Sequence, residues 1–333
     1  MYLVKSRKFW LNLSRIALSL AALVLLLREV GGADVWWVLQ HADLDCLGAA
    51  CLLFLLGIVI RVFRWRVLFH SLGMSPSFRL LLKLYLVGNF FNTVLPSGFG
   101  GDVVRVVELT QQERGTIPGA ATGASAAVGT VIVDRLTGIL SLMALGLLVL
   151  PFSPNLAPWL VWLFVVLALG GLLGGALLLE GRLLRWMTAY LPSALSLAGQ
   201  GKLADIYAVV SGAGAPAIWS ALTLSTLFNL VNIVIYWLCG LAVGIDVPLS
   251  FYFVLTPLLS LTLLVPISVG GLGARDWVAQ PLFGSVGVPD VIAAAMTLSV
   301  YAVTLAVGLI GLAIYLVEGL AGLWKRTEKD GKV

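Results

Sequence analysis

Long runs of apolar residues, interrupted by short polar segments, dominate the chain. The runs over residues 18–27 and 159–179 contain hardly any polar side chain. A helix needs roughly 20 consecutive apolar residues to cross the hydrocarbon core of a bilayer, and the runs are sufficient for about six crossings. Short strands of alternating hydrophobicity, which a transmembrane barrel would need, are not visible. The pattern therefore predicts an all-α polytopic membrane protein.

Charged residues and prolines divide the apolar sequence into six predicted spans. These spans cover residues 9–27, 44–62, 118–150, 159–179, 216–244 and 289–318. The third span would be about 50 Å long at 1.5 Å per residue, whereas the hydrocarbon core is about 30 Å thick. We therefore expect this helix to tilt, protrude or break.

Two further apolar stretches do not fit a complete crossing. The first, residues 80–95, has Arg79 at its start and Arg105 beyond its end, so a full crossing would leave arginine on the outer side. The second, residues 251–266, is too short and too interrupted to cross. We expect re-entrant hairpins over residues 79–116 and 251–288, each entering and leaving the membrane on one face.

The basic residues predict how the spans are oriented. Lys5, Arg7 and Lys8 precede the first span, and the loop that follows it is acidic. Cytoplasmic flanks are enriched in lysine and arginine, which places the N-terminus inside. Residues 319–333 form a basic tail that we also expect in the cytoplasm. The sequence thus predicts a multi-pass protein of a prokaryotic cytoplasmic (inner) membrane, with both termini cytoplasmic.

Composition excludes several other classes. The chain is 60% hydrophobic and 11% charged, against about 25% charged residues in soluble domains. The net charge of +5 comes from residues that flank spans, so we expect no nucleic-acid partner. Cys46, Cys51 and Cys239 show no disulfide or C-x-x-C spacing, and the two histidines are predicted on opposite sides of the membrane. We expect no metal and no cofactor.

An internal repeat relates the two halves of the chain. Residues 96–105 and 266–275 both fit P-x-x-x-G-G-x-x-x-R at an offset of 170 residues. The single membrane domain then consists of repeat one, residues 9–150, and repeat two, residues 159–318. Each repeat has two spans, a hairpin and a long span, an odd number of crossings, which predicts opposite orientations. Inverted repeats of this kind are typical of transporters with a substrate site near the bilayer midplane.

Charged residues at membrane depth mark the candidate site, because each costs roughly 2.5 to 3.5 kcal/mol on insertion scales. Arg105, Arg275 and Arg135 are predicted to form a basic cavity for an anionic head group, since guanidinium binds phosphate bidentately. Hairpin glycines and nearby polar groups would add neutral donors. The other predicted substrate-binding residues are Asp102, Asp134, Asp276, Asn89, Asn92, Ser97, Gly100, Gly101, Ser268, Gly270 and Gly271.

Other interpretations of these residues stay open at this point. Asp102 with Arg105, and Asp134 with Arg135, could be purely structural ion pairs, and the asparagines could simply join helices. The pair Asp43 and Asp45 in the first outer loop is the one enzyme-like pattern, because some membrane-embedded transferases use loop acids. No catalytic residue is assigned.

Several segments carry a resemblance to a known family. They are residues 61–66 (RVFRWR), 88–96 (GNFFNTVLP), 100–105 (GGDVVR), 133–138 (VDRLTG) and 266–273 (PISVGGLG). Together they resemble the lysylphosphatidylglycerol synthase transmembrane-region family, also called flippase-like. The resemblance extends over nearly the whole chain. Asp134 stands where many relatives have a glutamate, which preserves the charge.

The resemblance implies a protein that moves lipid between leaflets, without the soluble synthase domain that two-domain members carry. We expect a flippase-like transporter, not an enzyme, for an anionic or zwitterionic phospholipid or a polyprenyl-phosphate lipid. The sequence leaves open a homo-oligomer or a lipid-modifying enzyme as partner. The alternative is a membrane-embedded enzyme for glycosyl or phosphoryl transfer on such a lipid, or a subunit of one.

Overall fold

The computed structural model describes most of the chain. The described residues are 24, 28, 31–95, 100–112, 123–153, 156–180, 182–190, 197, 202–263 and 270–330. Across these residues the protein consists of helices and their connections, with no strand. The fold is therefore all-helical, as the apolar pattern predicts.

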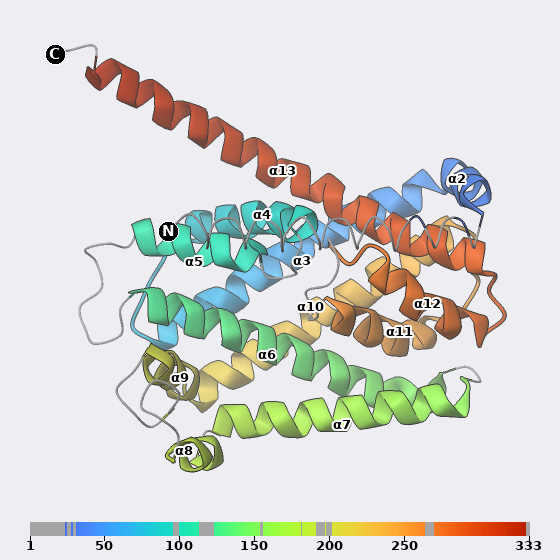
Figure 1. Cartoon of the computed structure of the whole chain (residues 1–333), viewed down its shortest axis with the longest axis horizontal. Helices are drawn as coiled ribbons and strands as arrows, with labels where there is room; N and C mark the ends of the chain where they lie inside the picture. The colour runs from blue at the N-terminus through green and yellow to red at the C-terminus, as the bar shows by residue number, and fades with distance from the viewer. Residues whose placement is uncertain are drawn as a thin grey trace, which may run out of the picture.

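The helices are labelled as in Figure 1. They are α2 (Gly32–Gln40), α3 (Leu44–Ser71), α4 (Phe78–Val94), α5 (Gly100–Gln112), α6 (Gly123–Val149), α7 (Pro158–Glu180), α8 (Arg182–Thr188), α9 (Lys202–Gly212), α10 (Ala215–Ala242), α11 (Leu249–Thr262), α12 (Ala274–Gly284) and α13 (Asp290–Asp330), with a 3-10 turn, η1, over Leu150–Phe152.

Five of the described helices are long and apolar enough to cross a membrane, which makes the chain a multi-pass membrane protein. They are α3, α6 with η1, α7, α10 and the part of α13 up to Glu318. These five correspond to five of the six predicted spans. The predicted span over residues 9–27 and the start of the span at Pro118 lie outside the described residues. The second span was predicted too short, because α3 continues to Ser71.

Helices α3 and α10 pack against each other in opposite directions. The backbone N–H of Asp43, just before α3, donates to the carbonyl of Ala242 at the end of α10, at 2.8 Å. In the other half of α3, Arg64 Nη1 donates to Ser225 Oγ at 2.8 Å. Between these points Gly57 lies against the Phe228 ring. The two helices thus form a central antiparallel pair, visible in Figure 1.

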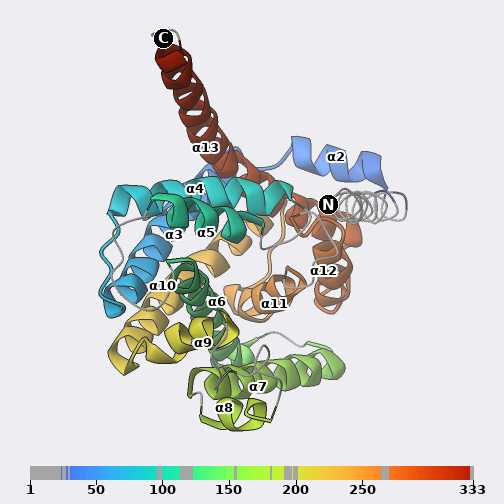
Figure 2. The ribbon, with the colours of Figure 1, turned by 60° about the vertical axis from the view of Figure 1, so that its left-hand side comes forward.

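The order of elements from α2 to α6 recurs from α9 to α13, and so do the contacts. Helix α4 packs against α13, and its counterpart α11 packs against α6; likewise α9 packs against α6 and α2 against α13. Figure 2 shows α4 with α5 and α11 with α12 on different sides of the central helices. The opposed orientation of the halves in a membrane, and the re-entry of the hairpins, stay predictions.

Helices α4 and α5, which make up the first predicted hairpin, approach each other at two glycines. A Cβ atom on Gly101 would overlap the carbonyl oxygen of Gly88, and a Cβ on Gly88 would meet the Arg105 side chain. The N–H of Gly101 donates to Asn92 Oδ1 at 2.7 Å. Glycine is therefore needed at this crossing because only its missing side chain lets the backbones come so close.

Candidate functional site

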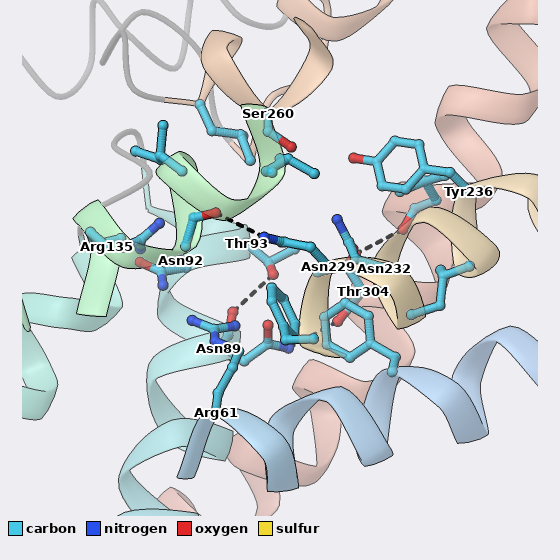
Figure 3. Close-up of a pocket in the computed structure, with 18 of the residues that line it drawn as sticks. Arg61, Asn89, Asn92, Thr93, Arg135, Asn229, Asn232, Tyr236, Ser260 and Thr304 are labelled. Carbon is cyan, nitrogen blue, oxygen red and sulfur yellow. Dashed lines mark hydrogen bonds between the residues drawn. The ribbon is translucent and has the colours of Figure 1, made fainter. Parts of the chain in front are cut away.

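A cavity of about 210 Å³ lies between the two halves of the fold. Helices α3, α4 and α6 supply one part of its wall, and α10 to α13, with Leu263 and Gly270 between α11 and α12, supply the rest. In Figure 3, Asn232 and Tyr236 of α10 reach it from one side, and Asn89, Asn92 and Arg135 from the other. The lining residues are Phe54, Arg61, Arg64, Asn89, Asn92, Thr93, Asp134, Arg135, Gly138, Ile139, Leu142, Phe228, Asn229, Asn232, Ile235, Tyr236, Ser260, Leu263, Gly270, Arg275, Val300 and Thr304.

Asp134 is the centre of a buried polar network beside the cavity. Its carboxylate is fully buried, and Arg64 Nε lies 2.6 Å from Oδ1. The Tyr85 hydroxyl donates to the other carboxylate oxygen at 2.9 Å. Arg64 also donates to Ser225 at 2.8 Å. An ion pair taken out of water needs such additional hydrogen bonds to offset its desolvation, so Asp134 serves to hold Arg64 in place.

A second ion-pair cluster joins α5 to α6. Asp102 accepts from Arg105 Nη1 at 3.0 Å through one oxygen, and Arg135 Nη2 lies 2.6 Å from its other oxygen. Asp102 is buried, whereas the Arg135 side chain is partly exposed at the cavity. One carboxylate therefore balances two guanidinium groups, and only Arg135 of these two arginines lines the cavity.

Arg105 is not one of the residues that line the cavity. Its side chain is 1% exposed, and the guanidinium stacks on the rings of Tyr85 and Trp65, at 3.7 and 4.1 Å from their centroids. Cation–π contact of this kind is strongest where the cation is desolvated. The expectation that Arg105 and Arg275 would line one cavity together therefore needs correction, because aromatic rings and Asp102 enclose Arg105.

Arg61 and Arg275 contribute cationic groups to the cavity from different halves of the chain. Within the described residues, neither forms an ion pair with a carboxylate. Arg61 lies over the rings of Tyr85 and Phe228, at 4.8 and 5.3 Å from the centroids. Arg275 Nε is buried without a hydrogen-bond partner. The cavity thus has two guanidinium groups that no carboxylate among the described residues contacts directly, although Asp134 interacts electrostatically with Arg61 and Asp276 with Arg275.

Neutral polar side chains complete the wall. Three of the four asparagines join helices: Asn92 accepts from the Gly101 N–H at 2.7 Å, Asn89 donates to the Thr304 carbonyl at 3.2 Å, and Asn229 donates to the Gly138 carbonyl at 2.8 Å. Three other polar side chains of the wall form no hydrogen bond in the described part of the chain. They are Asn232, Tyr236 and Ser260. These amide and hydroxyl groups can donate to or accept from a ligand.

The structure brings six of the predicted site residues to the cavity and leaves others away from it. Those in the wall are Asn89, Asn92, Asp134, Arg135, Gly270 and Arg275, whereas Asp102, Arg105, Gly100, Gly101, Gly271 and Asp276 are not in it. Asp276 instead accepts hydrogen bonds from the Gly273 N–H and the Thr297 hydroxyl, and so caps α12. Ser97 and Ser268 lie outside the described residues.

Sequence reasoning missed Arg61 and Arg64 as site residues. Both appear in the pattern RVFRWR, residues 61–66, at and beyond the predicted end of the span over residues 44–62. Because α3 continues to Ser71, these arginines lie within the helix and turn the same face inward. Their spacing of three residues was the available signal, since residues three apart share a helix face. The same signal was available on α10, where a spacing of three and then four residues separates Asn229, Asn232 and Tyr236.

Comparison with protein families bears on this site. The family described as "Lysylphosphatidylglycerol synthase TM region" matches residues 12–311 of the chain. That range contains all residues that line the cavity. No curated protein matches the chain.

Proposed function

Because the chain belongs to the lysylphosphatidylglycerol synthase TM region family, we propose that it is a flippase-like transporter, which moves a phosphate-containing lipid head group between the leaflets through the central cavity. Family membership supports a lipid-related role in a membrane. The observation that carries the finer proposal is the depth of the cavity. Arg61, Asp134, Asn229 and Thr304 line it from the middle third of the spans α3, α6, α10 and α13.

A polar cavity at this depth addresses the main barrier to lipid exchange. A charged head group is costly to move through hydrocarbon because it loses its water of hydration. Guanidinium, amide and hydroxyl groups in the wall can replace that water, and Arg offers bidentate hydrogen bonds to phosphate oxygens. The acyl chains would stay in the bilayer while the head group passes.

The recurrence of helices and contacts in the two halves supports alternating access. In transporters with inverted repeats, one half moves against the other around a site near the midplane. Here the cavity wall draws residues from both halves, and the antiparallel pair α3 and α10 lies at their junction. The hairpins α4–α5 and α11–α12 would then close the cavity alternately toward the cytoplasmic and the outer face.

The chain contains no G-x-x-x-x-G-K-[ST] motif for ATP. We propose transport that is downhill, coupled to an ion gradient or driven by a partner, in the cytoplasmic membrane of a prokaryote and with both termini inside. A lipid-modifying enzyme or a second copy of the chain would be the protein partner.

The rival proposal, an enzyme that uses Asp43 and Asp45, has less support. Asp43 Oδ1 accepts from the backbone N–H groups of Asp45 and Cys46, at 2.8 and 3.3 Å, and so caps the start of α3. An N-terminal cap explains an aspartate at this position without any chemistry. Both acids also lie at the N-terminal end of α3, whereas Arg61 and Arg64 lie in the second half of this helix.

Reconstituted vesicles test the proposal directly. The purified full chain is placed in vesicles that contain fluorescent phosphatidylglycerol, and dithionite is added to bleach the outer leaflet only. We expect bleaching to proceed beyond the outer half, and the variant Arg61→Gln, Arg275→Gln to bleach the inner leaflet more slowly than the wild type. Arg79→Gln is the matched control, because Arg79 is exposed at the start of α4 and away from the cavity. A folded wild-type protein that never exceeds the protein-free level would refute translocation of this lipid.

A further inference from the structure

The charges around the cavity do not balance. Four arginines line it, Arg61, Arg64, Arg135 and Arg275, whereas Asp134 is its one acidic lining residue among those described. The Asp134 carboxylate already forms an ion pair with Arg64 and accepts a hydrogen bond from the Tyr85 hydroxyl. Arg135 shares Asp102 with Arg105, so this carboxylate is also fully used. The excess positive charge of the wall is therefore carried by Arg61 and Arg275.

The buried position of these groups makes the excess informative. Arg275 Nε has no hydrogen-bond partner although it is buried, and a buried polar atom left unpaired costs about 1–3 kcal/mol. Arg61 is held by two aromatic rings and faces the cavity. Both guanidinium groups would gain their missing partners if an anion occupied the space between the halves.

The same wall disfavours a cationic group. An ammonium inside the cavity would meet four guanidinium groups, and the acidic residue that lines the described wall, Asp134, is already paired with Arg64. Like charges repel strongly where water is excluded. An aminoacylated lipid, whose amino groups reverse the charge of its phosphate, therefore fits this chain poorly.

The uncharged part of the wall indicates what accompanies the anion. Asn232, Tyr236 and Ser260 share one stretch of wall and have no side-chain partner in the described structure. Tyr236 is 4% exposed overall, yet its hydroxyl reaches the cavity in Figure 3. Amides and hydroxyls pair well with alcohol groups because each side can donate and accept. The wall suits hydroxyl groups next to the phosphate.

We propose that the cavity selects a net-anionic head group that carries phosphate and hydroxyl groups but no amine, as in phosphatidylglycerol. Its phosphate binds Arg61 and Arg275, and its hydroxyls contact Asn232, Tyr236 and Ser260. This inference rests on the proposed function and names the substrate class of the same site. It departs from what the family description alone would suggest, which is a lysylated lipid.

Three fluorescent lipids with identical acyl chains test the selection: phosphatidylglycerol, phosphatidylethanolamine and lysylphosphatidylglycerol. In the dithionite assay we expect phosphatidylglycerol to exchange at least about tenfold faster than the lysylated lipid, a difference of about 1.4 kcal/mol in barrier. Arg61→Gln with Arg275→Gln should slow phosphatidylglycerol and bring the ratio close to one. Arg61→Lys with Arg275→Lys keeps the charge and should retain the preference at a lower rate. Equal or faster exchange of the lysylated lipid overturns the proposal.

Binding separates this inference from the proposed function. Native mass spectrometry of the full chain with equimolar phosphatidylglycerol and lysylphosphatidylglycerol should show preferential retention of the former, and less preference in the glutamine variant. If no lipid is exchanged but this preference holds, translocation fails and the anionic site stands. If neither lipid is preferred, the site fails too. Glycerol 3-phosphate is the soluble comparison: if it displaces phosphatidylglycerol at equal concentration, the ligand is a free anion and not a lipid.

Discussion

Arg64 on α3 and Asp134 on α6, 70 residues apart in the sequence, form a buried ion pair with Nε 2.6 Å from Oδ1. Their side chains are 4% and 0% exposed, so neither charge is solvated by bulk water. The pair fixes the face of α3 that carries Arg61 and thus orients the cavity wall.

Asp134→Asn should destabilise the protein strongly. Removing one partner of a buried ion pair leaves an uncompensated charge and costs about 3–5 kcal/mol. We expect a lower unfolding temperature in detergent than for the wild type. The double variant Arg64→Met, Asp134→Leu should recover much of the loss because it removes both charges of the pair together. If Asp134→Asn were as stable as the wild type, the pair would not hold the two helices.

Gly101→Ala should separate α4 from α5, because the new Cβ would overlap the carbonyl of Gly88. Forcing extra atoms into a tight contact costs typically 1–3 kcal/mol, so we expect about that loss in the free energy of unfolding. Gly170→Ala on α7 is the matched control, since no atom lies within 4 Å of the position that its new methyl group would take. Alanine there should be neutral or stabilising by up to about 1 kcal/mol. Equal effects of the two changes would contradict the close crossing.

The sequence predicted the helices better than their partners. Apolar runs, divided by charged residues and prolines, located five spans, because the requirement for a continuous helix in lipid is strict. It could not tell that α3 continues past Val62, since arginines mark the end of a span only when they face the aqueous phase. Arg64 instead faces Asp134, a contact that depends on how two distant helices pack.

The candidate site was predicted only in part, because it too depends on how distant helices pack. The repeated P-x-x-x-G-G-x-x-x-R pattern includes Gly270 and Arg275, which line the cavity. It suggested the same role for Arg105, but the two halves differ in what surrounds the arginine. In the first half Trp65 and Tyr85 enclose it. A pattern along the chain does not reveal such three-dimensional surroundings.

Thiol labelling tests the predicted orientation. In a background without Cys46, Cys51 and Cys239, a membrane-impermeant maleimide added outside should label Asp290→Cys, at the start of α13. It should not label Ser75→Cys, in the turn between α3 and α4, until the membrane is permeabilised. Both positions are exposed, so access depends on the side of the membrane. Labelling of Ser75→Cys from outside would contradict the inverted arrangement.

Asp43 tests whether the outer acids have a chemical role. The backbone N–H groups of Cys46 and Asp45 lower the pKa of the Asp43 carboxyl. Since the folded pKa is below the unfolded one, the cap stabilises the protein above the unfolded pKa of about 3.9 and loses this effect as the pH falls through the folded value. The contribution of the Asp43 cap to the free energy of unfolding should thus be constant from pH 5 to 8.

Asp43→Asn should then leave both stability and lipid exchange unchanged at neutral pH, because asparagine caps helices about as well as aspartate. Asp43→Ala should lower the unfolding temperature modestly. The measurements are thermal unfolding in detergent and dithionite bleaching. Lost activity in a stable Asp43→Asn protein would support the enzyme alternative, since an amide cannot act as an acid or base.

Arg105→Met decides between the role expected from the repeated pattern and the role that the packing indicates. The change removes the stacking on Trp65 and Tyr85 and the ion pair with Asp102 but leaves Asp102 paired with Arg135. A desolvated cation–π contact contributes about 2 kcal/mol, so we expect a loss of about that size in the free energy of unfolding. Because Arg105 does not line the cavity, the folded fraction should keep the wild-type ratio of phosphatidylglycerol to lysylphosphatidylglycerol exchange. The decisive quantity is this ratio and not the total activity, since instability lowers the rates for both lipids equally. A ratio near one in folded Arg105→Met, as expected for Arg61→Gln with Arg275→Gln, would mean that Arg105 contacts the head group after all.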